Sequence, residues 1–273
     1  MLRKLIRYDM RSMGRFLWFI YLAVLAVAVI LGLSIRGAAS AVSNSPSYMG
    51  ASGDLVSSSV GMGILLAVYT LLLLAMFIIT VVMIIIRFYR NMLGGEGYLM
   101  HTLPVPSWML IVSKLLVGFI FELIALGVSI LSLGLMMLSS GSAKEIMQAI
   151  GVHISDLGEY KTIIVLLLIT LLVSMVYTIL LFYVSLAIGN LNNKHKILVA
   201  VAAFIGITIA VNIISGLLNI NSFATMFVVA GYPDSGMSVF QALLIKQIIL
   251  DAACAVGCFV GTNWIMNNRL NLA

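Results

Sequence analysis

Long apolar runs separated by short polar segments organise this sequence. Six runs dominate it, at residues 16–33, 61–86, 108–138, 162–188, 197–218 and 239–266. A helix needs about 20 apolar residues to cross a bilayer, and only helices or closed barrels satisfy the backbone there. All four prolines fall between the runs, where a missing N–H does no harm. The pattern predicts an all-α, polytopic membrane protein with six transmembrane helices.

The composition agrees with this reading. Hydrophobic residues make up 63% of the 273 residues and charged residues only 9%, whereas a soluble domain is about one quarter charged. The abundance of Leu, Ile and Val excludes intrinsic disorder, and two cysteines are too few for a disulfide scaffold. Soluble enzymes are excluded as well, because so few charges cannot cover a water-facing surface.

Basic residues are distributed unequally between the two sides of the predicted membrane domain. The N-terminus and the second and fourth loops carry most of them, namely Arg3, Lys4, Arg7, Arg11, Arg15, Arg87, Arg90, Lys114, Lys194 and Lys196, and the C-terminal tail adds Arg269. The other side carries only Arg36, Lys144 and Lys161. Cytoplasmic loops hold the Lys/Arg excess. We therefore expect a cell (inner or plasma) membrane protein with both termini in the cytoplasm, and topology explains the net charge of +6 without nucleic acid.

The first 15 residues have two faces when drawn as a helix. Apolar side chains gather on one face, at Leu2, Leu5, Ile6, Met10 and Met13, and basic ones on the other. This pattern predicts an interfacial amphipathic helix over residues 1–15. A basic flank that only orients the first span is the alternative. A cleaved signal peptide is disfavoured, since the run at 16–33 exceeds the usual apolar region of such peptides and five further spans follow.

The loop at residues 87–107 differs from a simple tether. Its glycines permit tight turns, and Tyr98, Leu99, Leu103 and Val105 then place apolar groups on a water-facing segment. Exposed apolar groups of this kind suit docking into a groove of another protein. The alternative is a loop that lies against the lipid headgroups.

The same loop resembles that of bacterial ABC transporter permeases of the type-2 exporter class. The matching residues are Glu96-Gly97-Tyr98-Leu99, Thr102-Leu103-Pro104-Val105, Leu110 and Ser113-Lys114-Leu115. The resemblance implies a coupling helix that docks on a separate ATP-binding subunit through Asn91, Glu96, Gly97, Tyr98, Leu99 and Leu103. It also implies two such subunits, which hold ATP and Mg, a second permease chain as homo- or heterodimer, and an external re-entrant segment at 219–239.

Four polar side chains lie inside predicted spans, where such groups are costly and often functional. They are Glu122 in the third span and Lys246, Gln247 and Asp251 in the sixth. Gln247 and Asp251 share a helix face at i, i+4. We expect Glu122 and Lys246 to form an interhelical pair, with a structural role favoured over one in gating. Asn212 and Asn263 are expected to bond to neighbouring helices.

The sequence lacks the residues that several kinds of catalysis require. The chain contains no Gly-Lys dipeptide, so the phosphate-binding loop of an ATPase is missing, and no H-E-x-x-H motif is present. His101, His153 and His195 all lie in loops, and no histidine accompanies Cys254 and Cys258. We therefore expect no catalytic residues, no metal and no cofactor bound by this chain.

The sequence thus favours the permease subunit of an ATP-driven exporter, in contact with membrane lipid and with ATP-binding subunits. The main alternative is a six-span secondary transporter or channel, driven by an ion gradient through Glu122, Lys246 and Asp251. A membrane sensor that binds a peptide without moving it is a third reading.

Overall fold

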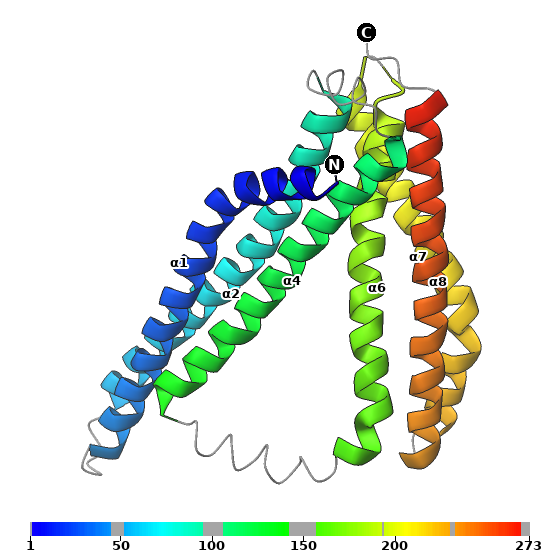
Figure 1. Cartoon of the computed structure of the whole chain (residues 1–273). Coiled ribbons are helices and arrows are strands. Elements are labelled where there is room, and N and C mark those ends of the chain that lie inside the picture. The colour runs from blue at the N-terminus through cyan, green and yellow to red at the C-terminus, as the bar shows by residue number, and fades with distance from the viewer. Residues whose placement is uncertain are drawn as a thin grey trace. The chain divides into compact units, whose positions relative to one another are not determined.

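The computed structural model describes residues 2–44, 52–94, 106–141, 157–192, 194–229 and 233–268. These residues are helical almost throughout (Figure 1), and no strand occurs among them. The elements are α1 (Leu2–Asn44), α2 (Ser52–Phe88), the π-helix η1 (Tyr89–Leu93), α4 (Ser107–Ser140), α6 (Leu157–Gly189), α7 (Lys196–Val229) and α8 (Pro233–Asn268).

The six predicted spans are confirmed as helices. Within the described residues, the segments long and apolar enough to cross a membrane are Ile6–Gly37, Val60–Leu93, Ser107–Ser140, Lys161–Gly189, Lys196–Ile220 and Met237–Asn268. At about 1.5 Å per residue, a helix of 34 residues such as α4 is about 51 Å long, against a hydrocarbon core of about 30 Å. The helices must therefore tilt or extend beyond the core.

The chain divides into two compact units, which we describe separately. The N-terminal unit comprises Arg7–Met83 and Ile120–Leu157, and the C-terminal unit comprises Met1–Ile6, Ile84–Phe119 and Gly158–Ala273. The boundaries cut through α1, α2 and α4. As a result, the end of α2 and the start of α4 belong to the unit that contains α6, α7 and α8.

Tyrosine hydroxyls join the helices of the N-terminal unit. The Tyr21 hydroxyl lies 3.4 Å from the Thr80 hydroxyl and donates to the Phe121 carbonyl oxygen, also at 3.4 Å. The Tyr69 and Ser132 hydroxyls are 2.8 Å apart. Each buried ring thus fills apolar space while its polar tip finds a partner on another helix. These bonds tie α1, α2 and α4 together.

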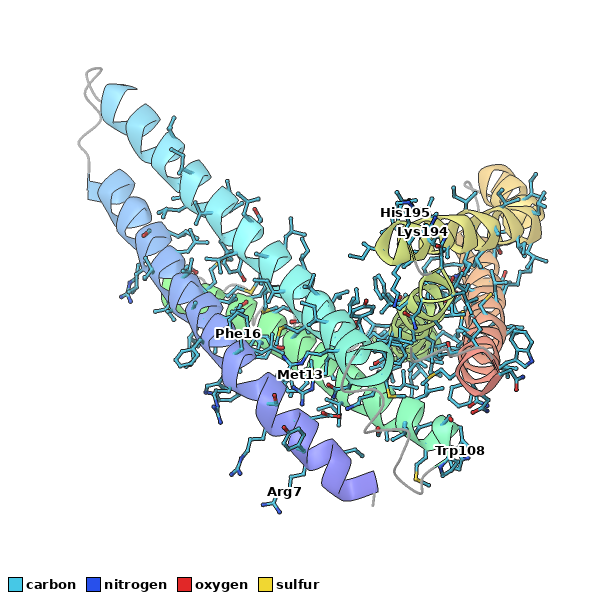
Figure 2. The ribbon with its side chains drawn as sticks, turned by 90° about the horizontal axis from the view of Figure 1, so that it is seen from above. Arg7, Met13, Phe16, Trp108, Lys194 and His195 are labelled. Carbon is cyan, nitrogen blue, oxygen red and sulfur yellow. The ribbon has the colours of Figure 1, made fainter. Side chains whose placement is uncertain are left out.

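Residues near the start of α1 follow the amphipathic pattern. Arg7, Arg11 and Arg15 are exposed, and Arg7 extends away from the helices in Figure 2, whereas Met13 is buried. The structure has one continuous helix from Leu2 to Asn44 in place of a separate segment at 1–15. Whether its first turns lie in the membrane interface stays a prediction.

Aromatic stacking and close helix approach organise the C-terminal unit. The rings of Phe88 and Tyr183 stack with centroids 3.8 Å apart, which joins α2 to α6. Phe182 and Phe204 stack at 4.8 Å and join α6 to α7. A Cβ added at Gly189 would lie 2.5 Å from the Ala200 Cβ, so these two helices approach closely beside the turn that connects them.

The structure places Lys114, residues 219–229 and residues 233–239 in helices. Lys114 is 4% exposed inside α4, so counting it with the water-facing basic residues of the second loop was wrong. Residues 219–229 continue α7, and residues 233–239 belong to α8. The expected re-entrant course of 219–239 stays a prediction.

Substitution of Gly32 tests the packing of the N-terminal unit. A Cβ there would overlap the Ser139 hydroxyl and come within 2.5 Å of the Met136 carbonyl oxygen, a backbone atom that cannot move cheaply. We expect Gly32→Ala to destabilise the protein by about 1–3 kcal/mol, measured as a lower melting temperature in detergent. Gly134→Ala, on α4 with nothing within 4 Å of the added Cβ, is the matched control; equal melting temperatures for the two variants would contradict the packing.

Candidate functional site

The end of α2 is built differently from an ordinary helix terminus. The chain widens into the π-helix Tyr89–Leu93, and the Gly94 N–H donates to the Tyr89 carbonyl oxygen at 2.8 Å, the i+5 bond of that geometry. Asn91, Met92 and Leu93 are buried. Single-turn π segments inside α-helices occur frequently at functional sites. The helix therefore ends in a packed turn directly before the loop expected to bind a partner.

Both ends of this loop are held by the same helix. On the α2 side, Phe88 is 1% exposed and stacks on Tyr183 of α6. On the α4 side, a Cβ at Gly118 would lie 3.2 Å from Ile84 and 3.5 Å from Ile179, so α4 passes closely between α2 and α6. The two helices that flank residues 95–105 thus both pack against α6, α2 at its last turns and α4 about three turns after its start.

The expected contact residues divide into two groups. Asn91 lies in the π-helix and is 6% exposed, so little of its side chain reaches the surface of the C-terminal unit. Its assignment as a docking residue stays a prediction. Glu96, Gly97, Tyr98, Leu99 and Leu103 lie outside the described residues.

A chain of hydrogen bonds links α7 to α8. The Asn219 amide donates to the Ser215 hydroxyl at 3.4 Å, and this hydroxyl donates to Gln247 Oε1 at 3.1 Å. Gln247 Nε2 in turn donates to Asp251 Oδ1 at 2.8 Å, across the i, i+4 spacing expected from the sequence. Every bond in the chain points toward the carboxylate, an arrangement in which successive bonds strengthen one another. Asp251 itself is 4% exposed.

The remaining polar side chains of the spans are placed as follows. The Lys246 ammonium donates to the Leu218 carbonyl oxygen at 3.5 Å, within the C-terminal unit. Glu122 belongs to the N-terminal unit and is 9% exposed, and its Oε2 has no hydrogen-bond partner within the described ranges. The two residues thus fall in different units, and the pairing of Glu122 with Lys246 stays a prediction. Asn212 donates to the Thr208 carbonyl oxygen of its own helix at 2.8 Å, and its expected bond to a neighbouring helix stays a prediction.

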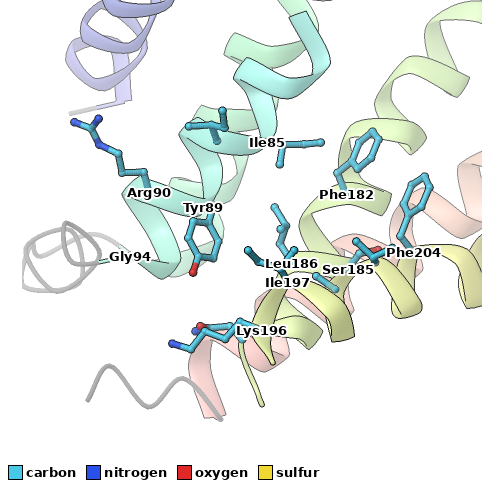
Figure 3. A pocket seen from close by; sticks show the side chains of 14 residues that line it. Ile85, Tyr89, Arg90, Gly94, Phe182, Ser185, Leu186, Lys196, Ile197 and Phe204 are labelled. Atoms are coloured by element: carbon cyan, nitrogen blue, oxygen red, sulfur yellow. The ribbon is translucent and has the colours of Figure 1, made fainter. Parts of the chain in front are cut away.

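The C-terminal unit contains a cavity of about 590 Å³ between α2, α6 and α7. Most of its wall is apolar, with Ile85, Phe182, Leu186, Ile197 and Phe204 among the lining residues. Tyr89 and Lys196 lie together at one end of it (Figure 3), and both also line an adjoining hollow of about 830 Å³ that includes Lys194 and His195. An apolar cavity of this size with a few polar groups at one end is the usual form of a small-molecule site.

The burial of Asp9 and the cavity between α2, α6 and α7 were not predicted from the sequence. Asp9 is 1% exposed, and its spacing from Met13 and Leu17, both buried, gave a signal because i, i+4 and i+8 share a helix face. No pattern in the sequence indicated the cavity, because its lining residues come from helices far apart in the sequence. In the described part of the chain, no group of three His, Cys, Asp or Glu side chains is placed to hold a metal ion.

Comparison with known proteins gave no relative. No protein-family model, no curated protein and no solved structure matches the chain. The structure shows six helices among the described residues that are long and apolar enough to cross a membrane.

Removal of the Gln247 amide tests the bond chain. In Gln247→Leu, the buried Asp251 carboxylate loses its 2.8 Å donor, and an unsatisfied buried polar group costs about 1–3 kcal/mol. We expect a lower melting temperature in detergent. The double variant Gln247→Leu/Asp251→Leu should recover most of the loss, because it removes both partners. Asn267→Leu, exposed on the same helix, is the control; additive losses in the double variant would contradict the coupling.

Proposed function

We propose that this chain is the permease subunit of an ATP-driven ABC exporter of the type-2 class. In this proposal two separate ATP-binding subunits supply the energy, and a second permease chain completes the membrane domain. The chain itself performs no catalysis and binds no cofactor. The proposal begins from the loop sequence Glu96-Gly97-Tyr98-Leu99 and Thr102-Leu103-Pro104-Val105, which resembles the coupling loop of such permeases.

The observation that supports the proposal most is that both helices flanking this loop pack within one unit. A partner that moves the loop can act on the spans only through the end of α2 and the start of α4, which join the loop to the spans. Here α2 reaches the loop through a buried π-turn and the Phe88–Tyr183 stack, and α4 leaves it with Gly118 packed against Ile84 and Ile179. Packed elements transmit displacement because they do not deform continuously. A force applied at residues 95–105 therefore reaches α6.

One face of α7 exposes a polar amide among apolar residues, and a second chain would cover it. Asn212 is exposed on α7, on a face that otherwise carries Ile205, Ile209 and Ile213. Amide side chains in transmembrane helices commonly satisfy their bonding capacity across a helix interface. We assign this face to contact with the second permease chain.

Docking and transmission are separable by two substitutions. Tyr98→Asp places a charge in the apolar docking segment and should abolish co-purification of the ATP-binding subunit, while the permease remains in the membrane. Phe88→Leu keeps an apolar side chain at the buried position but removes the stack, worth about 0.5–1.5 kcal/mol. It should retain the ATP-binding subunit and lose much of the ATP-dependent transport.

The measurement is affinity purification of the chain from membranes that express its neighbouring genes, followed by mass spectrometry and an ATPase assay. A co-purified subunit with a phosphate-binding loop and ATPase activity supports the permease assignment. Elution of the wild-type chain without any ATPase in mild detergent, or unchanged binding by Tyr98→Asp, would overturn it. Trp264→Leu, exposed on α8, controls for loss of a surface aromatic residue.

A specific observation keeps a second candidate function, a gradient-driven carrier, open. Glu122 Oε2 is buried without a hydrogen-bond partner among the described residues. Carboxyl groups in transmembrane spans serve as proton carriers in some transporters.

Glu122→Gln distinguishes the two candidate functions. Under the carrier hypothesis, this nearly isosteric change should abolish gradient-dependent uptake or release in proteoliposomes prepared without ATP. Under the permease proposal, transport needs ATP and the variant alters it by less than about threefold, because only packing near Glu122 changes. Gradient-driven transport by the wild-type chain alone would reject the permease proposal.

A further inference from the structure

We propose that the cavity between α2, α6 and α7 binds one anionic phospholipid, with an acyl chain in the apolar part and the headgroup phosphate at Lys194 and Lys196. The proposal does not depend on the exporter assignment. It rests on the shape and chemistry of the C-terminal unit alone.

The cavity opens onto the exposed surface of the C-terminal unit, beside the apolar residues of α2 and α7. Ile86, Ile197 and Val201 line it and are also exposed, with Ile197 at 77%. From Lys196 to Phe204 the wall follows α7 for eight residues, about 12 Å along the helix axis. Phe182 and Phe204 stack on each other at the far end. A flexible hydrocarbon chain fits such a pocket, because it can enter laterally and loses no hydrogen bonds inside.

The polar end of the cavity carries positive charge. Lys196 lines both the cavity and the adjoining hollow, and Lys194 and His195 line the hollow. Figure 2 places Lys194 and His195 at the start of α7. No Asp or Glu lines either space, as far as the described residues extend. Arg90 also lines the cavity, but its side chain extends away from it (Figure 3), and we assign it no role.

The backbone adds to this charge. α7 begins at Lys196, so the positive end of its helix dipole and the N–H groups of its first turn lie beside the lysines. Helix starts of this kind favour phosphate. The Tyr89 hydroxyl, at the same end of the cavity in Figure 3, offers one more hydrogen-bond donor.

The charge balance selects the class of lipid. A zwitterionic headgroup brings its own cation toward two lysines, whereas a headgroup with net negative charge does not. This end of α2, α6 and α7 is also the one that the Lys/Arg distribution assigns to the cytoplasmic side. Anionic lipids of that leaflet attract basic residues by about 1 kcal/mol each, or about fivefold in affinity.

Native mass spectrometry of the full chain in detergent tests the site. The protein is titrated with dioleoylphosphatidylglycerol or dioleoylphosphatidylcholine, and bound lipid is counted. We expect one tightly bound phosphatidylglycerol, and a loss of about 25-fold in its affinity for Lys194→Gln/Lys196→Gln if the two lysines act independently. Val201→Phe, which enlarges an exposed lining residue, should weaken binding while both lysines remain.

Arg36→Gln/Lys161→Gln is the matched control, because it removes two exposed cations elsewhere. It should bind phosphatidylglycerol as the wild type does. An equal loss in this control would show unspecific charge attraction and overturn the proposal. It would also fail if the lysine variant kept its preference for phosphatidylglycerol, or if millimolar inorganic phosphate displaced the lipid, because the site would then take the anion alone.

Discussion

A bilayer core offers no hydrogen-bond partner to a peptide group, and this constraint governs the whole chain. Every described segment with an apolar run is a helix, because a helix satisfies its backbone within the segment. Side chains meet the same constraint. Tyr21, Tyr69 and Gln247 each place a polar tip against a partner on another helix or one turn along their own. Polar bonds therefore fix helix positions that apolar contact alone would leave loosely specified.

The two units use this constraint in different ways. In the N-terminal unit, tyrosine hydroxyls cross from helix to helix, and Gly32 lets α1 approach α4 closely. In the C-terminal unit, stacked rings and one directed chain of hydrogen bonds perform this role. The stacked pair Phe88–Tyr183 also stands directly before the segment that the permease proposal assigns to energy coupling. Stability and transmission would then depend on the same contact.

The cavity shows where this packing stops. Between Phe182 and Lys196 the side chains of α2, α6 and α7 leave an apolar space, with basic residues at its polar end. Side chains of the protein could fill this space only if residues such as Ser185 and Ala200, which also line it, were larger. A permanently bound lipid would complete the unit without them, and it would place the first turn of α7 near a negative charge.

The sequence by itself determined the helical class, the six spans and the Gln247–Asp251 neighbours, because apolar run length and i, i+4 spacing are local properties. It also gave a signal for buried Asp9, which the spacing to Met13 and Leu17 carried. Only the tertiary structure decided that Asn91 and Lys114 are buried, that Asn212 bonds within its own helix, and that Phe88 meets Tyr183. These outcomes depend on which helices become neighbours and how closely they approach. Residues far apart in the chain determine this jointly, so no single segment reveals it.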